Sequence, residues 1–171
     1  MKEFKGIYLN FTSRLLFRKE YIIVFIFHTY LIFNFPLIKN YNILIEIIFF
    51  LIITKLLIFK TKSIVYKISF NENNVILLGE NFNKKWKKII SLEEIRLVLK
   101  SESSRAGLRS AIFYIQLKSG KLNHDINVFS NFKDEQIIEI FDEFKLRKVE
   151  KITLDERLII LRLKEKIIKC Q

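Results

Sequence analysis

Tyr21 to Ile38 reads YIIVFIFHTYLIFNFPLI, and Tyr41 to Phe59 reads YNILIEIIFFLIITKLLIF. The first run carries no charged residue, and the second carries only Glu46 and Lys55. Each run is close to the ~20 residues that a helix needs to cross about 30 Å of hydrocarbon. Because only a Lys-Asn pair separates the runs, they predict a transmembrane helical hairpin, with spans at 21–38 and 41–59. Two buried helices of a soluble α-protein are the other interpretation, and the near-absence of charge disfavours it.

Basic residues lie on both sides of this hairpin. The chain has 171 residues and a net charge of +12, from 30 Lys and Arg against 18 Asp and Glu. Bases are frequent before residue 21 and after residue 59, whereas the connecting turn holds only Lys39. By the positive-inside rule, this pattern predicts a multi-pass protein of the bacterial inner membrane with both termini in the cytoplasm. The lipid bilayer is then the expected partner of the charge, and nucleic acid is not expected.

Three polar side chains stand out in the apolar runs. Glu46 and Lys55 lie nine residues apart in the sequence, so on a helix they would occupy opposite faces and could not pair with each other. Lys55 is expected to reach the cytoplasmic interface. Glu46 could reach the outer headgroups or face a polar residue of the first run, where depth favours Asn34 over His28 and Thr29. An ionisable residue inside a span suggests function. For Glu46, ion conduction and a structural or oligomer contact are both open.

The segment at 1–20 mixes apolar and basic residues. It is predicted to be a basic juxtamembrane segment, and two structures are open for it. It could form an amphipathic stretch at the membrane interface, or it could supply a first strand to the domain that follows.

A different pattern begins after residue 60. Short runs of alternating or β-branched residues are separated by polar turns at intervals of about 8–12 residues, which is typical of a small antiparallel barrel or sandwich. A polar loop is expected at Ser101–Ser110. The predicted strands are Ser63–Phe70, Val75–Leu78, Phe82–Ile90, Ile95–Leu99, Ala111–Leu117 and Lys121–Phe129.

Two helices are expected at the C-terminal end. Residues 132–147 have apolar positions at helical spacing, with acids in the first turn and bases in the last, so a helix should close the β domain at 61–148. Residues 149–171 predict an amphipathic tail helix that starts at the capping-box pattern Thr153–Glu156. The tail could lie on the membrane, pack on the β domain or pair with another chain. The predicted class is therefore an α+β membrane protein.

Three segments of the β domain carry a resemblance to a known family. They are KKWKKIISLEEI at Lys84–Ile95, YIQLKSGKLNHDINVF at Tyr114–Phe129 and SNFKDEQIIEIF at Ser130–Phe141. Strand, turn, strand and helix in this order resemble the bacterial pleckstrin-homology (PH)-like domain membrane proteins, over residues 60–148 and with a hairpin as a common attachment. The resemblance implies a platform that binds lipid headgroups or proteins, and it implies no catalytic residue.

Two groups of residues are candidate contact sites. Four lysines surround Trp86, and clustered Lys beside an aromatic ring can hold a domain on anionic lipid or on a partner. The alternative is a buried core Trp on a solvated basic strand. Arg105 and Arg109 lie in the expected polar loop, where guanidinium groups could bind phosphate or carboxylate, unless the loop is simply solvated. The four lysines are Lys84, Lys85, Lys87 and Lys88.

Catalysis is not expected from this sequence. The one cysteine, Cys170, cannot form an intrachain disulfide, and the chain has only two histidines. His124 and Asp125 could suggest acid–base chemistry, but no nucleophile accompanies them. No phosphate-binding loop, dinucleotide motif or zinc-protease motif occurs, so no cofactor or metal is expected.

The predicted function is non-enzymatic binding. The cytoplasmic domain would recognise a protein partner or anionic lipid at the inner membrane, with an immunity or regulatory protein as one form of this role. The alternative is an oligomeric membrane component, such as a subunit of a small channel or transport complex, in which Glu46 would matter most.

Overall fold

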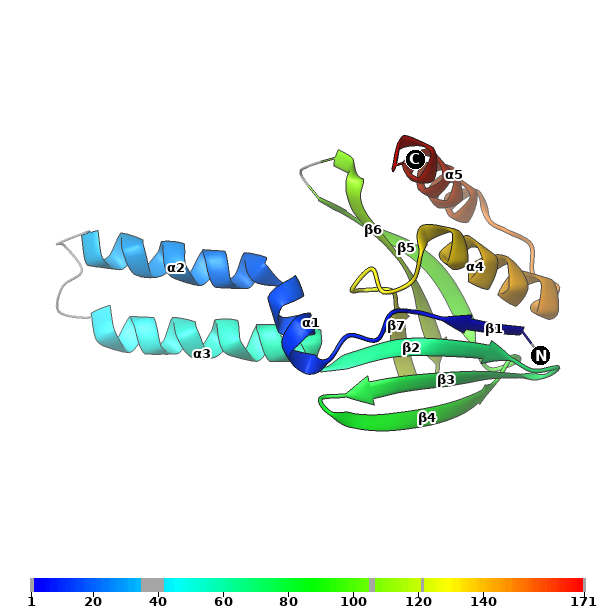
Figure 1. Ribbon diagram of the computed structural model, residues 1–171, viewed down its shortest axis with the longest axis horizontal. Coiled ribbons are helices and arrows are strands. Elements are labelled where there is room, and N and C mark those ends of the chain that lie inside the picture. Colours follow the sequence, from blue (N-terminus) through cyan, green and yellow to red (C-terminus); the bar gives the residue numbers. More distant parts are fainter. Residues whose placement is uncertain (1, 35–41, 105–106, 121, 171) are drawn as a thin grey trace. The chain divides into compact units, whose positions relative to one another are not determined.

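The computed structural model describes residues 2–34, 42–104, 107–120 and 122–170. The chain forms two compact units. We call Met1–Leu9 with Ile64–Gln171 the β domain, and Asn10–Ser63 the helical unit. In chain order the elements are β1 (Lys2–Lys5), α1 (Phe11–Phe17), α2 (Lys19–Asn34), α3 (Asn42–Thr61), β2 (Ser63–Phe70), β3 (Asn74–Asn81), β4 (Lys84–Ser91), β5 (Arg96–Ser104), β6 (Gly107–Ser119), β7 (Leu122–Ile126), α4 (Asp134–Lys148) and α5 (Leu154–Cys170) (Figure 1).

Aromatic contacts hold α2 and α3 together in the helical unit. The rings of Phe25 and Phe50 meet edge to face at 5.3 Å between centroids. Nearby, the His28 ring of α2 stacks on the Phe49 ring of α3, with 3.6 Å between centroids. Many apolar side chains on both helices remain exposed, including Phe50 at 49%. The two apolar runs therefore form paired helices, as expected from their composition.

The transmembrane prediction is wrong. Within the described parts of the chain, no helix is both long enough and apolar enough to cross a membrane. The first run contributes the described helix Lys19–Asn34 of 16 residues, which covers about 24 Å of the ~30 Å of a hydrocarbon core. The second helix includes Glu46, Lys55 and Lys60. The predicted multi-pass location in the inner membrane is overturned by the same finding. The connecting turn lies outside the described residues.

The β domain consists of two antiparallel sheets. Its larger sheet has the strand order β1-β2-β3-β4, and the smaller sheet has the order β5-β6-β7. Of the barrel or sandwich that the sequence predicted, the closed barrel is wrong, because no backbone ladder joins the two sheets among the described strands. Where β4 and β7 approach each other, side chains make the connection, as the stacking of Trp86 on His124 shows.

The hydrophobic core lies between the sheets, and α4 covers it. The inward residues of both sheets and the apolar face of α4 form one cluster, in which Ile115, Ile137, Phe141 and Phe144 are fully buried. Asn127 joins β6 to the segment that precedes α4: its Nδ2 donates to the Phe113 carbonyl at 2.7 Å, and its Oδ1 accepts from the Phe132 N–H at 2.8 Å. Both polar ends of this buried amide are therefore satisfied.

The N-terminal segment supplies a strand, which was one of its two open structures. Lys2–Lys5 pairs antiparallel with β2, and Phe4 enters the core at 3% exposure. The expected polar loop at Ser101–Ser110 is largely replaced by strand, because β5 continues to Ser104 and β6 begins at Gly107. β2 has the bounds that its alternation predicts.

The tail helix α5 packs on the β domain, which was one of the three placements that the sequence left open. Leu163 is fully buried, and Ile159, Ile160 and Ile167 pack against the core. The predicted capping box is confirmed: the Thr153 N–H donates to Glu156 Oε2 at 2.9 Å, and the Glu156 N–H donates to Thr153 Oγ1 at 3.3 Å. These bonds satisfy backbone donors that the first turn leaves without partners.

Candidate functional site

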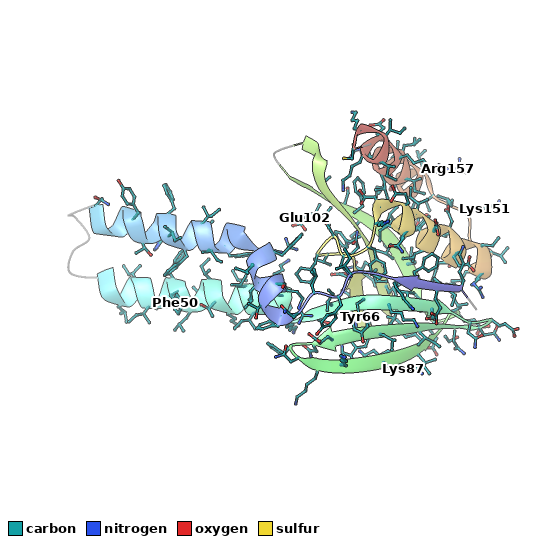
Figure 2. All side chains as sticks on the ribbon, in the orientation of Figure 1. Phe50, Tyr66, Lys87, Glu102, Lys151 and Arg157 are labelled. Atoms are coloured by element: carbon teal, nitrogen blue, oxygen red, sulfur yellow. The ribbon has the colours of Figure 1, made fainter. Side chains whose placement is uncertain are left out.

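The basic strand β4 is an outer strand of the larger sheet. It pairs antiparallel with β3 along its whole length, from Ser91 opposite Asn74 to Lys84 opposite Asn81. It is the last strand in the order of this sheet. Because side chains alternate along a strand, Trp86, Lys88 and Ile90 share the face that turns toward the core, where Ile90 is buried. Lys85, Lys87 and Ile89 share the opposite, exposed face. Figure 2 shows Lys87 on this outer strand.

Trp86 packs closely on the backbone of β3. It lies directly opposite Gly79 in the strand register. A Cβ atom added to Gly79 would lie 2.1 Å from Trp86 Cζ2 and 2.6 Å from the Ile64 carbonyl oxygen. The indole therefore occupies the space above a residue that has no side chain, an arrangement known from cross-strand aromatic–glycine pairs. Trp86 is half-buried against the core.

His124 of β7 connects this strand to the smaller sheet. Its ring stacks on Trp86 with 5.1 Å between centroids, and its Nε2 lies 3.0 Å from Lys88 Nζ. Burial lowers the pKa of His124 most, and the nearby Lys88 ammonium lowers it further. The Asp125 carboxylate has the opposite, smaller effect and raises this pKa. The imidazole is therefore neutral at pH 7, and Nε2 accepts a hydrogen bond from Lys88. The contacts of His124 with Trp86 and Lys88 therefore join the two sheets, and Lys88 is only partly exposed.

The other three lysines of β4 lie close together on one outer strand. Within the described residues, no carboxylate forms an ion pair with Lys84, Lys85 or Lys87, and all three are exposed. By contrast, six bases on β1, β2, α4 and α5 are neutralised by nearby acids. Those pairs are Lys2–Glu143, Lys67–Glu3, Lys145–Glu150, Lys145–Glu156, Arg147–Glu143, Lys148–Glu150 and Lys166–Asp134.

We call Lys84, Lys85, Lys87 and Ile89 the β4 surface. Ile89 is 61% exposed and follows the two lysines that share its face. Sequence reasoning placed the lysines here and missed Ile89. The signal was present, because residues 85, 87 and 89 have the spacing of one strand face. The contact between Lys88 and His124 had no local signal, because it joins two sheets.

The remaining predicted site residues are not brought together with the β4 surface. Arg105 lies outside the described residues, and the side chain of Arg109 on β6 is likewise not described. In the helical unit, Lys55 is exposed, and Asn34 Nδ2 donates to the Tyr30 carbonyl at 2.8 Å. The predicted contact between Asn34 and Glu46 is not tested, because the Glu46 side chain lies outside the description.

A polar groove of about 680 Å³ lies elsewhere on the β domain, along β5 and the facing ends of α4 and α5. Both acids and bases line it, and Lys145 and Lys148 form ion pairs with Glu150 and Glu156. Lys145 Nζ lies 3.0 Å from Glu156 Oε1, and Lys148 Nζ donates to the Ile95 carbonyl at 2.7 Å. These pairs leave the groove with little net charge available for a ligand.

The described residues contain no group of three His, Cys, Asp or Glu side chains that could hold a metal ion. Asp125 Oδ1 accepts a hydrogen bond from Gln116 Nε2 at 2.9 Å, so this carboxylate is held beside β6. The His124 ring contacts Lys88 and the Trp86 indole. Both side chains of the His124–Asp125 pair are therefore held by contacts with neighbouring strands.

Comparison with known proteins gives no relative for this chain: no family model, no curated protein and no solved structure matches it.

Proposed function

We propose that this chain is a non-enzymatic binding protein whose β domain recognises an acidic surface of a partner protein through the β4 surface. One observation carries the proposal. Lys84, Lys85 and Lys87 lie close together on one outer strand and are exposed without an ion pair among the described residues, whereas seven ion pairs neutralise six bases elsewhere in the domain.

The chemistry of the surface favours a protein over a polyanion. Ile89 adds an apolar contact beside the lysines, and protein interfaces combine an apolar centre with a charged rim. Lysines on an outer strand also prevent edge-to-edge pairing of sheets. That structural role accounts for their charge, and it is the alternative that the experiment must separate from binding.

The resemblance of residues 60–148 to PH-like domains stays a prediction. Two antiparallel sheets followed by α4 support it. A PH-like platform would act by binding, and an immunity or regulatory role would be one form of it. Fold likeness by itself assigns no partner.

The test measures binding of a fluorescent Glu-rich peptide to the full chain. We expect Lys84→Glu, Lys85→Glu and Lys87→Glu together to weaken the affinity by about tenfold or more, since three attractive charges become repulsive. A matched control reverses Lys118, Lys133 and Lys151, which are also exposed, and changes the net charge equally. The control should bind nearly as the unaltered chain does.

Three results would contradict the proposal. Equal losses in both triple variants would mean that overall charge, not this surface, attracts the peptide. Tighter binding to duplex DNA than to the peptide, with a steep dependence on salt, would indicate a nucleic-acid partner. Binding to anionic lipid vesicles but not to the peptide would assign the lysines to a lipid headgroup.

A further inference from the structure

One face of α5 is exposed although the helix is docked. Leu154, Leu158, Leu161 and Ile168 are 73%, 51%, 56% and 72% exposed. Together with exposed Glu165, these positions repeat at intervals of four and three residues. That spacing is the a/d seam of a coiled coil. We call these five residues the α5 seam.

The seam lies opposite the docked face. At 100° per residue, the five seam positions fall within an arc of about 80°, and Leu163 lies about 180° from the centre of that arc. Leu163 is fully buried, and Glu156 on the same side is 8% exposed. The β domain therefore uses one face of α5 and leaves a second apolar stripe, roughly 21 Å long at 1.5 Å per residue.

Basic residues flank the seam on both sides. Arg157 and Lys164 lie along one edge, and Arg162 and Lys169 lie along the other, where Asp155 is the only acid. All four bases are exposed, and Figure 2 shows Arg157 on α5. In a coiled coil these are the e and g positions, which select the partner by charge.

These charges disfavour a second copy of the chain. Pairing two α5 helices would bring Arg and Lys of one copy against Arg and Lys of the other, in either direction. Like charges across an interface cost free energy and suppress the wrong partner. A helix with acids at its flanks would instead meet opposite charge on both edges of the seam.

Glu165 separates a helical partner from a lipid surface. It lies in the middle of the seam, where an acidic side chain would face the anionic boundary of a bilayer. Interfacial helices carry a wide apolar face, commonly with Trp or Phe, and the seam is narrow and has neither. In a coiled coil, by contrast, one polar residue at a seam position sets the register of the partner.

We propose that the α5 seam binds an amphipathic helix of a partner protein, with Leu or Ile along its own seam, Glu or Asp at the flanks, and one Lys or Arg opposite Glu165. The helix is already formed and docked through Leu163, so binding needs little further ordering of this chain. The inference uses a different surface from the β4 surface and does not depend on the proposed function.

The test uses a synthetic peptide about three heptads long, with Leu at the seam, Glu at the flanks and one central Lys. Fluorescence anisotropy measures its affinity for the full chain. We expect Leu158→Gln with Leu161→Gln to weaken binding about tenfold or more, because central apolar anchors dominate interfaces. Leu146→Gln is the matched control, since Leu146 on α4 is 75% exposed and lies outside the seam.

A charge exchange tests the flanks. Arg157→Glu with Lys164→Glu should weaken binding of the Glu-flanked peptide and strengthen binding of a peptide with Lys at the same positions. The triple reversal on β4 should leave the affinity for the Glu-flanked peptide within about twofold, because effects at distant sites are independent. Failure at one surface is thus distinguishable from failure at the other.

Each of the following outcomes would overturn the inference. The double Gln variant could bind the peptide as well as the unaltered chain while its Trp86 fluorescence reports a folded domain. Sedimentation could show self-association that Leu158→Gln and Leu161→Gln abolish, which would make a second copy the occupant. Anionic vesicles could capture the chain through the seam while the peptide does not bind.

Discussion

Gly79 and Trp86 face each other across β3 and β4, and the indole fills the space that a side chain on Gly79 would occupy. The glycine is therefore required by contact and not by an unusual backbone angle. A methyl group added to Gly79 would clash on two sides, with the indole and with the Ile64 carbonyl oxygen of β2, which lies only 2.6 Å from the position of the added carbon. The aromatic–glycine pair thus adds a close side-chain contact to the backbone ladder between β3 and β4.

Gly79→Ala should destabilise the β domain. Overpacking in a close-packed region costs about 1–3 kcal/mol, and we expect a loss of about 2 kcal/mol in the free energy of unfolding. Trp86 is the single tryptophan of the chain, so urea unfolding followed by its fluorescence reports on this domain. Gly120→Ala is a useful comparison, because Gly120 has open space but a φ of +54°, and its cost would come from the backbone alone.

A cost below about 0.5 kcal/mol for Gly79→Ala would contradict the close packing of the indole on β3. Circular dichroism is then the second readout, because a displaced indole changes its own fluorescence. A shift in the fluorescence midpoint without a matching shift in the loss of β-structure would mean that only the ring had moved.

His124 should make the β domain less stable below about pH 6.5. Its pKa is lowered in the folded protein, first by burial and then by Lys88, whereas an unfolded histidine titrates near 6.5. Between these two values the unfolded chain binds more protons, so the free energy of unfolding falls as the pH falls. Unfolding midpoints in urea at about pH 5.5 and 7.5 measure the effect.

The His124→Gln variant is the control for this pH dependence. It removes the titrating ring and should flatten the stability profile between these two pH values. The lowered pKa values of Glu3, Glu143 and Glu150 act in a separate window, because their carboxylates start to protonate only near their ordinary value of 4.5. An equally steep profile in the variant would assign the titration to another group.

Lys145 should be important for the docking of α5. Its Nζ lies 3.0 Å from Glu156 Oε1 and 3.3 Å from Glu150 Oε2. The Lys145 and Glu156 side chains are 8% and 10% exposed. Removing one partner of a buried ion pair leaves a charge without compensation and costs about 3–5 kcal/mol. We expect Lys145→Met to cost about 3 kcal/mol or to release α5, which trypsin would then cleave at its bases.

A double-mutant cycle separates the pair from the packing of the lysine stem. Lys145→Met combined with Glu156→Gln removes both charges, so the loss should be smaller than for Lys145→Met alone. Strictly additive losses would mean that the ion pair contributes nothing. Limited trypsin digestion should show the same order, with α5 cleaved fastest in the single variant.

Local patterns in the sequence predicted the β domain better than its assembly. The alternation in Ser63–Phe70 and the capping box at Thr153 depend on near neighbours, and both agree with the structure. The approach of β4 to β7 depends on contacts distant in sequence, and the pairing of Lys145 with Glu156 depends on how two separate helices dock. The barrel alternative of the predicted barrel or sandwich failed at this level.

The prediction of membrane spans failed for a different reason. Apolar content alone suggested two spans, whereas no helix of the described residues is both long enough and apolar enough to cross a membrane. For the candidate site, the lysines of β4 could be read from the sequence. The hydrogen bond between Lys88 and His124 could not, because it joins strands of different sheets.

Val149→Gly should stabilise the β domain. Val149 ends α4 with a φ of +53°, a left-handed conformation that costs roughly 1–2 kcal/mol for a residue with a Cβ atom. Helices commonly end with glycine at this position. Val149 is 90% exposed, so little packing is lost, and we expect a gain of about 1 kcal/mol after the greater freedom of glycine in the unfolded chain is included. Val149→Ala should gain less, because it keeps the Cβ atom. Urea unfolding followed by Trp86 fluorescence measures both, and a loss of stability in the Gly variant would show that α4 does not end through this turn.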